Sequence, residues 1–121
     1  MQYALLIYQG TTPLPTDPEA WSTLSEGEQK AIYADYGSIH STPGVTPGLP
    51  LGLPERAKTV RVQNGTTTTT DGPVNEGPLG VIGGYFVLDA DNLDAAIELA
   101  GRIPAARHGG AIEVRPVETY W

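Results

Sequence analysis

Two segments of the chain, residues 3–8 and 84–88, are apolar on both of the faces that a β-strand presents. A strand with one solvated face alternates apolar and polar residues, so this pattern is typical of strands that are covered on both sides. The rest of the sequence predicts only two helices, which can cover one face of a sheet. We therefore expect a second copy to cover the other face, in a homodimer whose sheets pack face to face.

The first helix is expected to begin after Ser25, because Ser25 and Glu28 have the spacing of a capping box, and to end near Ser41. The second is expected to begin at an Asp91 cap and to stop at Gly101. Four apolar residues at helical spacing predict the buried face of this second helix. They are Leu93, Ala96, Ile97 and Ala100.

A β-hairpin is expected between the two helices. Asn64-Gly65 separates two runs rich in β-branched residues, 59–63 and 66–70, and this dipeptide favours a two-residue turn because both turn positions need positive φ. Before the hairpin, residues 43–54 contain four Pro and three Gly. This composition excludes a helix and leaves at most a short edge strand at Leu49-Leu51-Leu53.

These elements and a last strand at residues 111–115 give the order β-α-(ββ)-β-α-β in a single domain over residues 1–121. This order predicts an α+β, ferredoxin-like fold with an extra β-hairpin, in which the helical crossovers place parallel strands next to one another. In the last strand, Ile112 and Val114 are expected on the face opposite Glu113.

The charge and the absence of Cys limit the classes of function. The chain has 14 Asp and Glu against 7 Lys and Arg, a net charge of -7, which disfavours binding to nucleic acid or to anionic membranes. Its first apolar stretch is too short for a signal peptide or a membrane span, so we expect a cytoplasmic protein. With no Cys and two separated His, no metal site is predicted, and any chemistry is left to carboxylates, His, Tyr and Arg.

Six segments of the chain can be compared, in order, with a known family. They are Tyr3-Ala4-Leu5-Leu6-Ile7-Tyr8, Thr59-Val60-Arg61, Thr70-Asp71-Gly72-Pro73, Gly83-Gly84-Tyr85-Phe86, Asp94-Ala95-Ala96-Ile97-Glu98 and Ile112-Glu113-Val114-Arg115-Pro116-Val117. Together they resemble YCII-related proteins of the DGPF type over almost the whole chain. The resemblance implies a dimeric α+β barrel, and it implies much less about activity.

The chain departs from this family pattern at two places. After Asp-Gly-Pro the family pattern continues Phe-x-Glu-x-Lys-Glu, so Glu76 matches here while the Lys is missing. In the broader YCII group a His-Asp pair is the proposed catalytic unit, with the Asp just before a Pro that corresponds to Pro104. Ile103 precedes Pro104 in this chain, so that Asp is not carried over.

Three residues are candidates for proton transfer. Asp71, the residue of the family motif, is the first candidate for a general base at the mouth of a barrel; the alternative is an Asx-type turn. Glu76 is a candidate for a second carboxylate or for binding a ligand hydroxyl, with a plain surface acid as the alternative. His108 has a pKa suited to proton transfer, but a lone loop His is more often simply solvated.

Two further residues are candidates for substrate contact. Arg61 is suited to an anionic substrate, although an ion pair with a neighbouring acid is the commoner use of such an Arg, and the same holds for Arg115. Tyr85 is the other candidate, with a place in the core or the dimer interface as its alternative. His40 is explained by the helix dipole, which favours a cation at the end of the first helix.

Three functions remain open at this point. One is a cofactor-free lyase or isomerase that transfers a proton on a small organic molecule, as resemblance to enzymes of this fold class implies. Another is a non-catalytic module that binds a ligand or a protein partner and serves regulation, because members of the family are often associated with sigma factors. The third is a structural dimer without a ligand.

Overall fold

The computed structural model describes residues 1–75, 77 and 80–120 and has an α+β fold. Its elements follow in this order: β1 (Gln2–Tyr8), α1 (Pro18–Ser22), α2 (Glu26–His40), β2 (Val45–Pro47), the 3-10 helix η1 (Pro54–Arg56), β3 (Lys58–Gln63), β4 (Thr66–Asp71), β5 (Ile82–Asp89), α3 (Leu93–Arg102), η3 (Pro104–Ala106) and β6 (Ala111–Pro116). None of the helices in this part of the chain is long and apolar enough to cross a membrane.

Four of the strands form one sheet in the order β2-β5-β1-β6, and every neighbouring pair is antiparallel. This arrangement is compatible with a ferredoxin-like fold. The expectation of parallel neighbours is wrong. The two strands on either side of each helix do run parallel, but each crossover passes over one strand position, which is filled by an antiparallel strand from the other half of the chain.

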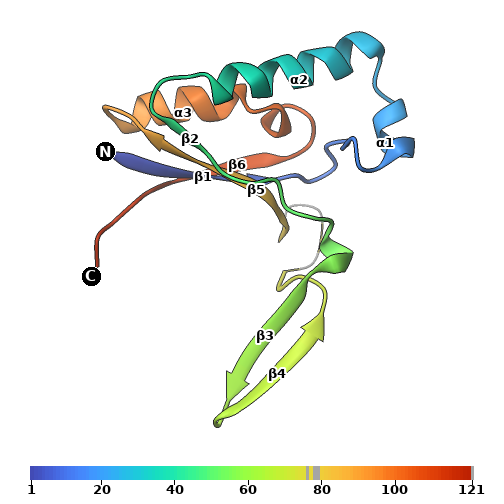
Figure 1. The fold of residues 1–121 in the computed structure, drawn as a ribbon, viewed down its shortest axis with the longest axis vertical. Coiled ribbons are helices and arrows are strands. Elements are labelled where there is room, and N and C mark those ends of the chain that lie inside the picture. Colours follow the sequence, from blue (N-terminus) through green and yellow to red (C-terminus); the bar gives the residue numbers. More distant parts are fainter. Residues whose placement is uncertain (76, 78–79, 121) are drawn as a thin grey trace.

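The core lies between one face of this sheet and helices α2 and α3, which cover that face together (Figure 1). Leu5 stands at its centre, fully buried on β1 and paired with Phe86 on β5 and Val114 on β6. Val114 and Ile112 both pack against the core, as the alternation in the last strand predicts. Every second residue of these strands therefore packs against the helices.

The capping box of α2 is confirmed, because Ser25 Oγ accepts from the Glu28 backbone N–H at 3.1 Å and Glu28 Oε1 accepts from the Ser25 N–H at 2.9 Å. The cap expected for α3 is wrong. Asn92, one residue after Asp91, accepts from the Ala95 N–H at 3.0 Å. Asn92 holds this place because it has the extended backbone of an N-cap residue and lies directly before the first helical residue.

The buried face of α3 is also turned relative to the expectation. Leu93 and Ile97 are exposed, whereas Leu99 is buried beside Ala96 and Ala100. The buried side carries two small Ala side chains, which allow a helix to pack closely on its neighbours. Leu93 and Ile97 lie on the flank of the helix.

Two short elements before the hairpin, a helix and an edge strand, differ from the prediction. Helix α1 follows an Asp17 cap, in a stretch for which no helix was expected, and its Trp21 packs edge-on against Tyr33 of α2 at 5.5 Å between ring centroids. The edge strand lies at Val45–Pro47, where it pairs with β5, and not at the leucine alternation. Of those leucines, Leu51 donates one backbone hydrogen bond to Gly83 O, which is too little for a strand.

The predicted hairpin is confirmed, with Asn64 and Gly65 both at positive φ in its turn. Strands β3 and β4 pair only with each other and form a second, two-stranded sheet. Figure 1 shows that this hairpin projects away from the four-stranded sheet on the side opposite the helices. We call residues 58–71 the hairpin arm.

The second face of the four-stranded sheet has no helix over it in the described part of the chain (Figure 1). The residues that point to this face alternate with the core residues, and they include Ala4 and Leu6 on β1 and Tyr85 and Val87 on β5. They are only partly buried, and Tyr85 is 38% exposed. One face of the sheet is thus packed and the other, although largely apolar on its central strands, is open.

Truncation of the central core residue should weaken the fold strongly. Leu5→Ala leaves a cavity at a position with no solvent exposure, so we expect the free energy of unfolding to fall by about 3 kcal/mol. Leu49→Ala, at a position that is 69% exposed, is the matched control and should change it by less than about 0.5 kcal/mol. Urea denaturation followed by circular dichroism measures both values, and similar losses for the two variants would contradict the placement of the core.

Candidate functional site

Asp71 is the last residue of β4 and lies opposite Lys58, the first residue of β3. The Lys58 ammonium donates a hydrogen bond to the Asp71 carboxylate, and both side chains are well exposed. The turn after Asp71 is held by other groups, because the Gly72 N–H donates to Ala57 O and the Thr59 hydroxyl donates to Gly72 O, both at 2.8 Å. Within the described residues the carboxylate of Asp71 accepts from Lys58 alone, so it does not make the Asx-type turn.

The candidates for substrate contact lie apart from each other. Arg61 is in the middle of the hairpin arm and exposed, and no hydrogen bond or ion pair of its guanidinium is found among the described residues. Tyr85 lies on the open face of the four-stranded sheet, and Gly48 approaches it so closely that a Cβ there would come 2.0 Å from Tyr85 O. Arg115 forms the expected ion pair with Glu113, at 4.0 Å.

His108 lies in the turn between η3 and β6, half-buried and close to α2. The residue before it, Arg107, forms an ion pair with Asp35 of α2. Hydrogen bonds from the backbone and hydroxyl of Ser25 hold the pKa of Glu28 below its ordinary value of 4.5, and the charge of His108 lowers it slightly further.

Helix α2 also carries the most buried titratable ring near this region. Burial raises the pKa of the Tyr36 hydroxyl, and the positive charge of Arg107 opposes that shift. Tyr36 stacks on Phe86, and His40 meets the same Phe86 edge-on at 5.5 Å between ring centroids. These aromatic contacts attach α2 to the sheet.

The structure does not bring the candidate residues into one site. No hydrogen bond or ion pair joins any two of Asp71, Arg61, Tyr85 and His108. The remaining candidate, Glu76, lies outside the described residues. Groups of three or more His, Asp or Glu that could hold a metal ion do not occur in the described part of the chain.

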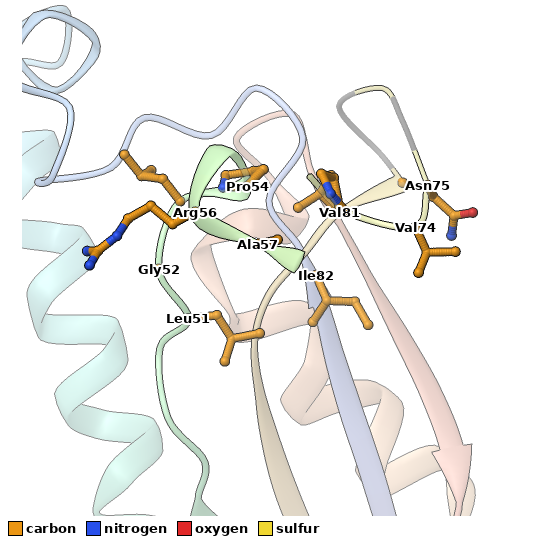
Figure 2. Close-up of a pocket in the computed structure, with 12 residues that line it drawn as sticks. Leu51, Gly52, Pro54, Arg56, Ala57, Val74, Asn75, Val81 and Ile82 are labelled. Carbon is orange, nitrogen blue, oxygen red and sulfur yellow. The ribbon is translucent and has the colours of Figure 1, made fainter. Parts of the chain in front are cut away.

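A pocket of about 400 Å³ lies at the base of the hairpin arm, next to the turn that follows Asp71. Leu51, Val74 and Ile82 are exposed side chains that line it, and Arg56 brings the one charge found among its described lining residues. Figure 2 shows Leu51 and Ile82 on either side of Ala57, with the Arg56 guanidinium on the side of the pocket away from Val74 and Asn75.

The sequence analysis identified neither Arg56 nor the apolar residues of this pocket. Residues 51–54 were interpreted only through their Pro and Gly and as part of a possible edge strand, and Ile82 precedes the strand that was predicted. The pairing of Lys58 with Asp71, by contrast, could have been predicted from the sequence. A two-residue turn at Asn64-Gly65 fixes the register of the arm, which places Lys58 directly opposite Asp71.

A family model described as YCII-related domain matches residues 1–120. The chain belongs to the YCII-related domain family. A search of curated proteins finds no match. In this YCII-related domain Ile103, the residue before Pro104, is fully buried in the core, so this position offers no carboxylate to a His-Asp unit.

Proposed function

We propose that this YCII-related domain binds a small, largely apolar molecule with one anionic group, in the pocket at the base of the hairpin arm. The observation that carries the proposal is that three exposed apolar side chains, those of Leu51, Val74 and Ile82, line one pocket. Exposed apolar residues that gather in a concave site are typical of ligand binding. In a chain with a net charge of -7, the Arg56 guanidinium is the group that favours an anion there.

Two probes of the same shape test the charge preference of the pocket. We expect 4-phenylbutyrate to bind more tightly than the neutral 4-phenyl-1-butanol, because only the carboxylate can accept charge-assisted hydrogen bonds from Arg56. Arg56→Gln should weaken 4-phenylbutyrate binding by about three- to tenfold and leave the alcohol unchanged. Titrations followed by NMR chemical shifts measure these affinities.

The apolar part of the pocket is tested with the same probes. Leu51→Ser should weaken both probes by a similar factor, since Leu51 lines the pocket, and Leu49→Ser should weaken neither, since Leu49 is outside it. Wild-type protein that binds neither probe, or a Leu49 variant that loses as much affinity as the Leu51 variant, would contradict the proposal.

We also propose that the domain works as a homodimer, joined through the open face of its four-stranded sheet. The support is the apolar character of Leu6, Tyr85 and Val87 on a face that no described helix covers. A sheet face of this kind is stabilised when it packs on another sheet about 10 Å away. Such a pairing of two sheets is the dimeric α+β barrel that the family resemblance implies.

A second candidate function is proton transfer by Asp71 on a molecule bound in the pocket. The observation in its favour is that Pro73, two residues after Asp71, lines the pocket, while the Asp71 carboxylate has no backbone donor among the described residues. A carboxylate placed beside a bound molecule is a common general base in enzymes. This activity would make the domain a cofactor-free lyase or isomerase.

Proton transfer can be detected without knowledge of the natural substrate. If Asp71 is a general base, the wild-type domain should speed the exchange of the C3 protons of 4-phenyl-2-oxobutyrate for deuterium in D₂O, measured by proton NMR. Asp71→Asn should reduce this rate by about a hundredfold or more with the fold intact by circular dichroism. Binding of the oxo acid with no faster exchange than in buffer would contradict catalysis and favour a non-catalytic binding module.

A further inference from the structure

The hairpin arm has one apolar face that the other described residues leave exposed. Val60 and Val62 are 59% and 64% exposed, and both point to the same side of β3. Thr69 and Thr67 stand directly opposite them on β4 and add their methyl groups to this side. We call these four residues the valine face of the arm.

An arm of this kind is not stable by itself. Two-stranded hairpins are marginal in water unless a third strand or another element packs on them. The arm is anchored at its base, where Thr59 is buried and its hydroxyl bonds to Gly72 O, but farther along neither strand pairs with the four-stranded sheet. An element from outside the described part of the chain would therefore stabilise the arm by covering the valine face.

Two observations favour a second copy of the chain as the element that covers it. First, the arm projects on the same side of the molecule as the open face of the four-stranded sheet (Figure 1). Second, each strand of the arm has 6 residues, so the arm is about 20 Å long, twice the spacing of about 10 Å between packed sheets.

We propose that each hairpin arm clasps the second copy of the chain, with the valine face packed on the side of that copy's sheet. The proposal rests on the homodimer proposed above and adds a second contact to it. In a face-to-face dimer an arm of this length passes the plane of the opposite sheet and reaches its helix layer. The arm then contributes its valine face to the dimer, while Arg61 and Gln63, on its other side, stay in solvent.

The test compares variants on the two sides of the arm. Val60→Thr combined with Val62→Thr keeps the shape and the β-propensity of both side chains but removes apolar surface from the contact. Gln63→Thr combined with Thr68→Ser changes the opposite side of the same two strands and is the matched control. The dissociation constant of the dimer is measured by sedimentation equilibrium, and circular dichroism checks that each variant is folded.

We expect the valine-face variant to weaken the dimer by at least about tenfold and the control by less than about twofold. Hydrogen exchange should also show the amides of β3 and β4 more protected in wild-type dimer than in dilute monomer. A wild-type dimer whose affinity does not change in the valine-face variant overturns the clasp and leaves the proposed dimer standing. A wild-type chain that stays monomeric at millimolar concentration overturns both, and the pocket is then tested separately by its own probes.

Discussion

The packing of one face of the four-stranded sheet on α2 and α3 is the interaction on which the rest of the structure depends. Leu5 is at its centre, between Phe86 and Val114 on the neighbouring strands, and both helices contact this layer. Because side chains alternate along a strand, the same three strands must point their other residues away from the helices. The packed core and the open face are thus two results of one strand pattern.

The two regions for which we propose a function both lie outside the packed core. The hairpin arm lies between β2 and β5 in the chain, and the pocket forms below it, where residues 51–57, residues 73–75 and the start of β5 meet. Asp71 and Lys58 close the base of the arm next to that pocket. Binding at the pocket and contact with a second copy are therefore proposed for two adjoining parts of the molecule that both lie outside the core.

Much of the fold was predictable because it follows from local rules. The capping box at Ser25 fixes the start of α2, and Asn64-Gly65 fixes the turn of the arm and its register. The order of strands was less accessible, since antiparallel neighbours come from tertiary pairing between the two halves of the chain. The helical spacing of apolar residues in α3 predicted that Leu93 and Ile97 are buried. The structure instead buries the side of the helix that carries Ala96, Leu99 and Ala100. The pocket could not be predicted from the sequence, because residues 51–57 form no α-helix or strand whose periodicity would show which side chains lie together.

If the open face of the sheet is an interface, a charge introduced at Leu6 should prevent dimerisation. Leu6 lies between the buried residues Leu5 and Ile7 on β1 but points to the open face. Sedimentation of Leu6→Lys against the wild type, with circular dichroism to check folding, is the decisive measurement. We expect a folded monomer for the variant and a dimer for the wild type. A variant that unfolds, or one that remains as dimeric as the wild type, would contradict the proposed interface.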